Sequence, residues 1–190
     1  MSERMIGAHL QAHLSGIKAR TLFNKEHWEI YEGNSFTAFQ VNEDMGDGDK
    51  INFGFKTPTT PEIHMIADFR AKTAAHMTIF EGPTFSGGLG SGLAVPIHNR
   101  DRNSATQSTL LTNINETGFS ASGALNSDLT GLGGGTAVWQ AFVFAVKNTP
   151  AGLSRGKQEF ILKTGTIYAI EVEADAATSA AEIELNWYEE

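Results

Sequence analysis

The segment Glu62-Ile-His-Met-Ile-Ala-Asp-Phe-Arg-Ala71 decides the fold class, because apolar side chains recur along it at every second position. Four of them would share one face of an extended strand: Ile63, Met65, Ala67 and Phe69. A period of two is typical of a β-strand with one buried face. The segment is therefore predicted to be a strand over the core of a β protein.

Other segments have the same character and are separated by Gly, Pro, Asn or Asp. The further predicted strands are residues 35–41, 50–56, 75–81, 107–114, 137–147 and 159–163. Because none of these strands is followed by a ten-residue helical pattern, a doubly wound α/β fold is excluded. The sequence predicts an all-β, antiparallel β-sandwich of jelly-roll-like type with long Gly-rich loops. The longest loop, residues 116–136, is predicted to be a flexible surface excursion.

Two more predicted strands, residues 168–172 and 183–187, are apolar on one face and acidic on the other. If they pair as a hairpin around residues 175–180, Glu171, Glu173, Glu182 and Glu184 lie together on one acidic face. Like charges on neighbouring strands are destabilising, so a basic partner surface would relieve them. Glu171 and Glu184 are accordingly predicted to be interface residues.

The N-terminal segment has apolar residues at helical spacing and is predicted to be a short arm or helix over residues 1–20, with the sandwich over 21–190. Its candidate interface residues are Met5, Ile6, Leu10 and Leu14. Such a segment often orders only on a partner. His9 and His13 stand four residues apart, as metal ligands on a helix can, but no third ligand accompanies them, so they are interpreted as structural.

The polar stretch Val95-Pro-Ile-His-Asn-Arg-Asp-Arg-Asn-Ser104 supplies two further interface candidates, Arg100 and Arg102. Arginines fixed on a turn suit bidentate binding of a carboxylate or a backbone carbonyl. The competing interpretation is a turn built through local side-chain bonds to the backbone by Asn99, Asp101, Asn103 and Ser104. Both interpretations stay open from the sequence.

Composition limits the classes of function. The chain has 190 residues, no cysteine and a net charge of −8. It is predicted to be soluble, without a membrane segment or a signal peptide. Its acidity argues against nucleic acid as a partner. The absence of cysteine excludes disulfides and thiolate metal sites.

Motifs for catalysis, cofactors and metals are missing. The run Gly87-Gly-Leu-Gly-Ser-Gly92 lacks the Gly-Lys-Ser/Thr ending of a phosphate-binding loop. The turn Asp44-Met-Gly-Asp-Gly-Asp49 lacks the distal Glu of a calcium-binding loop. The prediction is a protein without enzyme activity, cofactor or metal.

Four motifs follow one another in an order that resembles a family of tailed-bacteriophage virion structural proteins, the head decoration or cement proteins. They are Glu81-Gly-Pro-Thr84, Asn99-Arg-Asp-Arg-Asn-Ser104, Glu159-Phe-Ile-Leu-Lys-Thr-Gly-Thr-Ile-Tyr168 and Asn186-Trp-Tyr-Glu-Glu190. The resemblance covers roughly residues 50–190. The chain departs from the family pattern at Thr164, where the family favours Pro, and in the longer loop over 116–136.

The resemblance implies a non-enzymatic subunit that is made in the host cytoplasm and binds the assembled capsid surface. The implied partner is the major capsid protein, and a homo-oligomer, such as a trimer, is expected. The alternative is a fibre-like or carbohydrate-binding module of the virion, because aromatic side chains can stack on sugars. The candidates for such stacking are Trp28, Tyr31, Trp139, Trp187 and Tyr188, of which Trp139 and Trp187 are expected to be buried.

Overall fold

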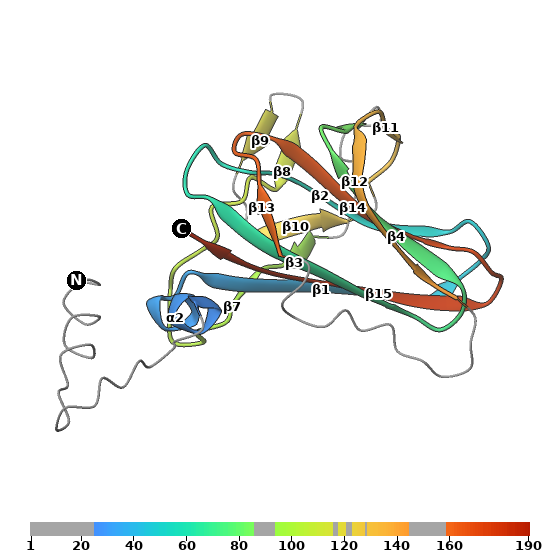
Figure 1. Ribbon diagram of the computed structural model, residues 1–190, viewed down its shortest axis with the longest axis horizontal. Coiled ribbons are helices and arrows are strands. Elements are labelled where there is room, and N and C mark those ends of the chain that lie inside the picture. The colour runs from blue at the N-terminus through green and yellow to red at the C-terminus, as the bar shows by residue number, and fades with distance from the viewer. Residues whose placement is uncertain (1–24, 86–93, 116–117, 121–122, 128, 145–158) are drawn as a thin grey trace, which may run out of the picture.

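The protein forms two antiparallel β-sheets that pack face to face, with a helix at one end (Figure 1). The computed structural model describes residues 25–85, 94–115, 118–120, 123–127, 129–144 and 159–190, with only the backbone at 113–115 and 118–120. Every strand pair in these ranges is antiparallel. The predicted all-β antiparallel sandwich is thus confirmed, and its jelly-roll detail stays a prediction.

The first sheet has five strands in the order β13-β3-β15-β1-β7. Their bounds are β13 (Phe160–Leu162), β3 (Ile63–Ala71), β15 (Ser179–Glu189), β1 (Ser35–Met45) and β7 (His98–Asn99). The two long central strands β1 and β15 pair with each other, so the first strand in the described part of the chain lies beside the last one.

The second sheet has six strands in the order β12-β4-β14-β2-β10-β6. Their bounds are β12 (Thr136–Val143), β4 (Ala75–Glu81), β14 (Ile167–Ala174), β2 (Lys50–Lys56), β10 (Ala124–Ser127) and β6 (Ala94–Pro96). Two small ribbons accompany the sheets: β11 (Leu132–Gly133) pairs with β5 (Thr84–Phe85), and β8 (Asn113–Asn115) pairs with β9 (Gly118–Ser120).

The core lies between the sheets and is built from the alternating apolar residues of the long strands. The five-stranded sheet contributes buried side chains that include Phe36, Met65, Phe69, Ile183, Leu185 and Trp187. The six-stranded sheet contributes Ile51, Phe53, Phe55, Met77, Ile170 and Val172. The period-two pattern therefore assigned the inward face of these strands correctly, because each alternate side chain meets the opposite sheet.

A helix, α2 (Lys25–Glu32), precedes β1 and contacts β1 and β15. The sequence pattern was interpreted as β from residue 17 onward, and this prediction is wrong for the helix. Gly33 follows α2 with φ of +78°, and a Cβ there would lie 2.4 Å from Ser104 Oγ. Its carbonyl accepts a hydrogen bond from Asn99 Nδ2 at 2.7 Å. The end of the helix and the polar 95–104 stretch are thus packed together, and only glycine fits between them.

The stretch 116–136 was predicted to be a flexible surface loop, and this prediction is wrong for its central part. β10 inserts between β2 and β6, and Leu125 is completely buried. Asn52 of β2 fixes the following backbone, since its Oδ1 accepts from Leu129 N at 2.7 Å and its Nδ2 donates to Leu129 O at 3.2 Å. A Cβ at Gly54 would lie 2.3 Å from Leu129 Cδ1, so β2 needs glycine where this segment crosses it.

Residues 107–114 were predicted to form a strand, and most of them do not. Among the described residues of this stretch, Leu111 forms an isolated bridge with Lys56, and β8 begins at Asn113. The polar groups of Ser108 and Thr109 instead bind the side chain of Glu189.

Candidate functional site

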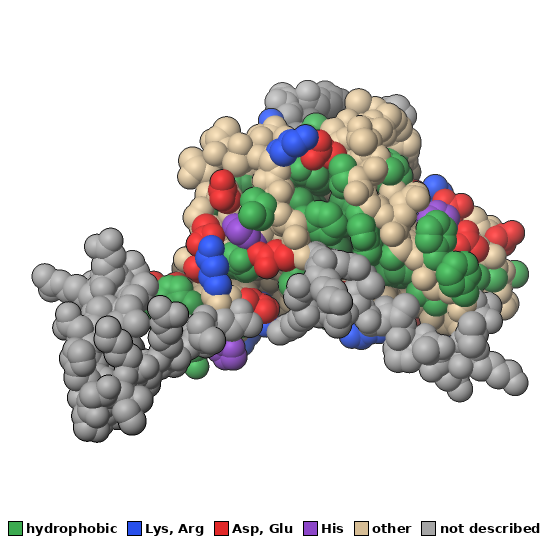
Figure 2. All heavy atoms as spheres, in the orientation of Figure 1, with side chains coloured by type: hydrophobic (Ala, Val, Ile, Leu, Met, Phe, Trp, Pro, Cys, Tyr) green, Lys and Arg blue, Asp and Glu red, His purple; other side chains and the backbone are tan. Residues whose placement is uncertain are grey.

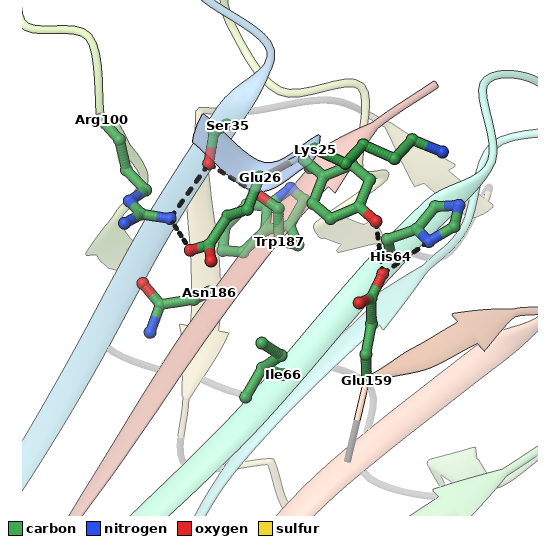
Figure 3. A pocket seen from close by; sticks show the side chains of 10 residues that line it. Lys25, Glu26, Ser35, His64, Ile66, Arg100, Glu159, Asn186 and Trp187 are labelled. Atoms are coloured by element: carbon green, nitrogen blue, oxygen red, sulfur yellow. Dashed lines mark hydrogen bonds and ion pairs between the residues drawn. The ribbon is translucent and has the colours of Figure 1, made fainter. Parts of the chain in front are cut away.

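A pocket of about 200 Å³ opens at the α2 end of the five-stranded sheet (Figure 3). Its lining comes from segments far apart in the sequence: α2, β1, β3, β15, the residue after β7 and the residue before β13. The lining includes Lys25, Glu26, His64, Arg100, Glu159 and Tyr188. Charged groups of both signs therefore meet over an apolar floor that includes Trp187 and Ile66.

His64, Glu159 and Tyr188 form one hydrogen-bonded group on the pocket wall (Figure 3). Glu159 Oε1 lies 2.7 Å from His64 Nδ1 and also accepts a hydrogen bond from the Tyr188 hydroxyl. The His64 and Tyr188 rings stack with centroids 4.6 Å apart. His64 Nε2 lies 3.2 Å from Glu190 Oε2, although the two atoms are not aligned for a hydrogen bond.

This arrangement joins β3, β15 and the residue before β13. Among the described residues, no serine or threonine hydroxyl hydrogen-bonds to His64, which leaves it without an adjacent nucleophile. Ser35, the serine of the pocket, directs its hydroxyl to the Trp187 carbonyl at 3.4 Å. Burial, and then the Glu159 carboxylate, raises the pKa of Tyr188, so its hydroxyl remains a proton donor at neutral pH.

The Glu159 carboxylate makes the stability of the fold depend on pH. Partial burial raises the pKa of Glu159, but the hydrogen bonds from Tyr188 and His64 lower it more, so it lies below the usual value of 4.5. A carboxylate with a lowered pKa stabilises the folded state fully above the unfolded value, and this stabilisation is lost as the pH falls through the folded value.

Replacing Glu159 with Gln should therefore reduce stability at pH 7 and should have less effect at pH 3. The reduction should be no more than about 1 kcal/mol, because the carboxylate is 40% exposed and screened by water. Urea unfolding at pH 7, 5, 4 and 3 measures the difference between the two proteins. Glu182→Gln, which removes an exposed partner of Arg70, is the control. A difference that stayed constant from pH 7 to pH 3 would contradict this assignment.

Arg100 lies on the opposite side of the pocket and binds within the domain. Its Nη1 donates to Glu26 of α2 and lies 3.4 Å from Ser35 Oγ. Its backbone N–H donates to the Ser35 carbonyl at 2.8 Å. The predicted charge-assisted bond is thus present for Arg100, through one nitrogen rather than as a bidentate pair. Arg102 is exposed and makes no hydrogen bond or ion pair with a described residue.

The turn-building interpretation of this polar stretch is also confirmed. Asn99 Oδ1 accepts from Asp101 N, and Asp101 Oδ1 accepts from Asn103 N, each at 2.9 Å. Ser104 Oγ accepts from Thr106 N at 3.2 Å. These local bonds set the loop that presents Arg100 to α2.

Glu189 forms a second hydrogen-bonded group on the inner side of the same end of the molecule, and no local pattern in the sequence indicates it. Its buried carboxylate accepts from Ser108 Oγ at 2.6 Å, from Thr109 Oγ1 at 2.7 Å and from Thr109 N at 3.0 Å. Trp187 Nε1 donates to the same carboxylate at 3.2 Å. One side chain thereby fastens the 107–112 segment to β15.

The residues of the four motifs that carry the resemblance form contacts within the domain. Glu81 of the first motif accepts from Tyr168 of the third at 2.9 Å and pairs with Lys163. Glu159 of the third motif accepts from Tyr188 of the fourth. The hydrogen bond from Lys163, and then that from Tyr168, lowers the pKa of Glu81. These motif residues therefore help to hold the strands of the fold together.

The predicted single acidic face is not present. β14 and β15 belong to different sheets, so Glu171 and Glu184 project from opposite outer faces of the sandwich. Each glutamate also has a basic neighbour: Lys50 Nζ lies 2.9 Å from Glu171 Oε1, and Arg70 Nη2 lies 3.8 Å from Glu184 Oε2. The chain passes from one sheet to the other between these strands, which a period-two pattern cannot reveal.

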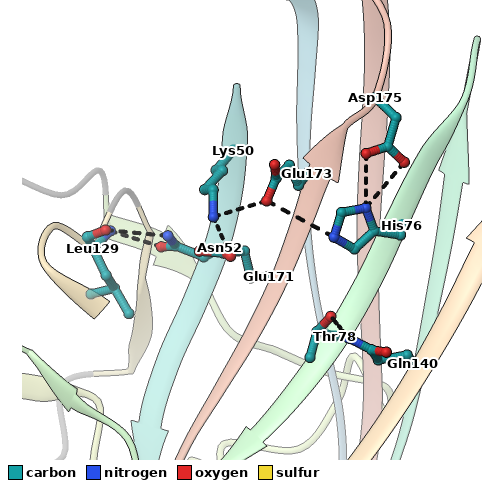
Figure 4. A network of polar contacts seen from close by, with 9 residues as sticks. All are labelled: Lys50, Asn52, His76, Thr78, Leu129, Gln140, Glu171, Glu173 and Asp175. Carbon is teal, nitrogen blue, oxygen red and sulfur yellow. Dashed lines mark hydrogen bonds and ion pairs between the residues drawn. The ribbon is translucent and has the colours of Figure 1, made fainter. Parts of the chain in front are cut away.

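On the outer face of the six-stranded sheet the acidic residues belong to a charged network (Figure 4). Lys50 bridges Glu171 and Glu173 at 2.9 Å each. His76 Nδ1 lies 3.0 Å from both carboxylate oxygens of Asp175. Burial lowers the pKa of Lys50, but its hydrogen bonds to Glu171 and Glu173 outweigh burial and raise it.

An apolar patch lies beside this network on β12 and the residue after it. We call Val138, Phe142 and Phe144 the β12 patch; their exposed fractions are 41%, 53% and 74%. The Phe142 ring stacks on His76 at 5.5 Å and on Phe144 at 6.2 Å. Figure 2 shows hydrophobic side chains gathered over the strands at this side of the molecule. The β12 patch was not predicted from the sequence. A sequence pattern could have indicated it, because residues 136–144 carry no charge and are apolar on both faces of the strand.

Several predicted residues lie outside the described part of the chain. They are Met5, Ile6, Leu10, Leu14, His9, His13 and the glycine run 87–92. The boundary predicted at residue 20 also lies there. Of the aromatic residues considered for sugar stacking, Trp187 and Tyr188 are buried, Trp139 is half-buried and Tyr31 is 73% exposed.

Comparisons with family models, with curated proteins and with solved structures find no match to this chain. In the described ranges, no helix is long and apolar enough to cross a membrane. The same ranges hold no group of three or more His, Asp or Glu side chains placed to bind a metal ion.

Proposed function

We propose that the protein is a non-enzymatic structural protein of a tailed-phage virion, which binds the assembled capsid surface as a decoration or cement protein. Its partner is the major capsid protein, and its place is the outer surface of the virion. The observation that carries the proposal is the β12 patch, on which three large apolar side chains face solvent within one short segment.

The β12 patch has the character of a protein contact. Aromatic side chains are enriched in the energetically dominant parts of protein interfaces. Contiguous apolar surface that stays exposed marks a site of interaction. Phe142 and Phe144 are held stacked before any partner arrives, which lowers the entropic cost of ordering them on binding.

Two further observations support a structural role. The order of the four motifs resembles that of phage decoration proteins, and the residues of those motifs hold strands and loops together. In the pocket, the polar groups of His64, Glu159 and Arg100 are bound to one another or to neighbouring strands. A stable sandwich with an adhesive surface patch meets the needs of a capsid-binding subunit.

Replacing Phe144 with Ser should weaken binding to capsids at least tenfold. Loss of a well-packed interface aromatic costs about 2 kcal/mol or more, which corresponds to more than a tenfold change in affinity. The measurement is cosedimentation of the purified protein with phage capsids that lack it. Phe144 is 74% exposed, so the substitution should leave the thermal unfolding midpoint nearly unchanged.

Ile161→Ser is the matched control, because Ile161 is a 63% exposed apolar residue on β13 in the other sheet. It should bind capsids as the unaltered protein does. Equal binding by the Phe144 and Ile161 variants would remove the β12 patch from the contact. Failure of the unaltered protein to bind capsids would overturn the proposed function itself, and a glycan array would then test the carbohydrate-binding alternative.

A further inference from the structure

β12 is longer than the other strands that lie at the edges of the two sheets. It ends the six-stranded sheet, so one side of its backbone has no strand partner among the described residues. The other sheet edges are short: β6 and β13 have three residues each and β7 has two, and β6 includes Pro96. β12 has eight residues and contains neither proline nor a charge. Long, uncharged edges are open to pairing with another strand.

β12 has no charged side chain, and this favours a second copy of the same chain as its partner. The chain carries a net charge of −8, so contacts between two copies are disfavoured wherever their carboxylates approach. β12 is the longest edge strand among the described residues, and two copies can meet along all of it without opposing charges in the strand itself. A basic partner protein would be recognised through acidic side chains, and β12 contains no acidic side chain.

The sequence of β12 is also complementary to itself about Gln140. In an antiparallel pair with Gln140 opposite its own copy, Val138 stands opposite Phe142, and Trp139 stands opposite Ala141. The first pair lies on the outer face, where Val138 and Phe142 are exposed. The second lies on the inner face, where Trp139 and Ala141 are half-buried. Aromatic residues opposite β-branched ones stabilise paired strands, and large residues pack well opposite small ones.

We propose that β12 pairs antiparallel with β12 of a second copy around a two-fold axis at Gln140. The two six-stranded sheets then form one continuous sheet, and the edge is removed by pairing. The β12 patches of the two copies lie on the same outer face of that sheet. This inference does not depend on the proposed function, because the dimer forms without a capsid.

Cross-linking of a single introduced cysteine tests the register directly. The natural chain has no cysteine, so Gln140→Cys places one thiol on the proposed axis. Directly opposite residues of an antiparallel pair have Cα atoms about 4.5–5.5 Å apart, a separation that a disulfide can span. Mild oxidation should convert most of this variant to a covalent dimer on a non-reducing gel. Ile161→Cys, exposed on the edge of the other sheet, should stay monomeric on the same gel.

Charge substitution at the same position supplies a second, reversible test by sedimentation equilibrium. Gln140→Lys and Gln140→Glu should each raise the dimer dissociation constant by up to about fivefold, because each places like charges opposite one another. Mixing the two variants should restore dimers. The inference is overturned if the unaltered protein is a monomer or a trimer, if Ile161→Cys cross-links as readily as Gln140→Cys, or if the mixture dissociates like its components.

Discussion

Replacing Glu189 with Ala should lower the free energy of unfolding by about 3 kcal/mol or more. The buried carboxylate accepts hydrogen bonds from Ser108, Thr109 and Trp187. Each bond to a charged group contributes about 1.5–3 kcal/mol, and each buried donor left without an acceptor costs about 1–3 kcal/mol. These contributions are not additive, so the expected loss is smaller than their sum. Urea unfolding at pH 7 provides the measurement.

Two matched variants show whether the position of the carboxylate is what matters. Glu182→Ala removes a glutamate from the same strand, but that glutamate is paired with Arg70 on the outer face and should cost no more than about 1 kcal/mol. Glu189→Gln keeps the shape of the side chain but turns an amide toward groups that donate, so it should remain clearly destabilising. A loss for Glu189→Ala no larger than that for Glu182→Ala would show that the segment is held by other contacts.

Replacing Leu125 with Ala should destabilise the fold by about 2–5 kcal/mol, the usual range for shortening a fully buried leucine. Leu125 belongs to β10, has no exposed surface and packs into the main core. The result is informative because this residue lies within a Gly-rich and Ser-rich stretch that has the composition of a surface loop. Guanidinium unfolding with tryptophan fluorescence would measure it, since Trp187 belongs to the same core.

Val138→Ala is the control for Leu125→Ala, because it also shortens an aliphatic side chain in the six-stranded sheet. Val138 is 41% exposed and should cost less than about 0.5 kcal/mol. A Leu125 variant as stable as the Val138 variant would mean that β10 is not a fixed part of the sheet in solution.

The sequence predicted the fold class and the inward faces of the long strands, because alternation is a local pattern that burial enforces residue by residue. It missed β10, since four residues carry too little alternation to be recognised and the backbone that follows them is fixed by Asn52, which is distant in the sequence. It also missed α2, an eight-residue helix that is placed by contacts with β1 and β15 and by the Arg100 bond to Glu26.

The functional residues were harder to predict than the strands, for a topological reason. The chain crosses between sheets after β14, so glutamates that look adjacent in the sequence separate to opposite faces. Conversely, His64 and Glu159 are brought within 2.7 Å although 95 positions separate them. Arg100 could be identified because its position on a polar turn is a local feature.

The pairing of β1 with β15 also bears on how the protein folds as it is synthesised. Ser35 lies opposite Tyr188, so the first strand of the sandwich leaves the ribosome long before its main partner exists. β3 pairs with β15 as well, so the centre of the five-stranded sheet is completed by the last strand to be made. Sheets dominated by contacts so distant in sequence fold slowly, on a scale of about milliseconds to seconds. Until β15 is released, β1 and β3 remain exposed strands that a chaperone or a neighbouring nascent chain can bind.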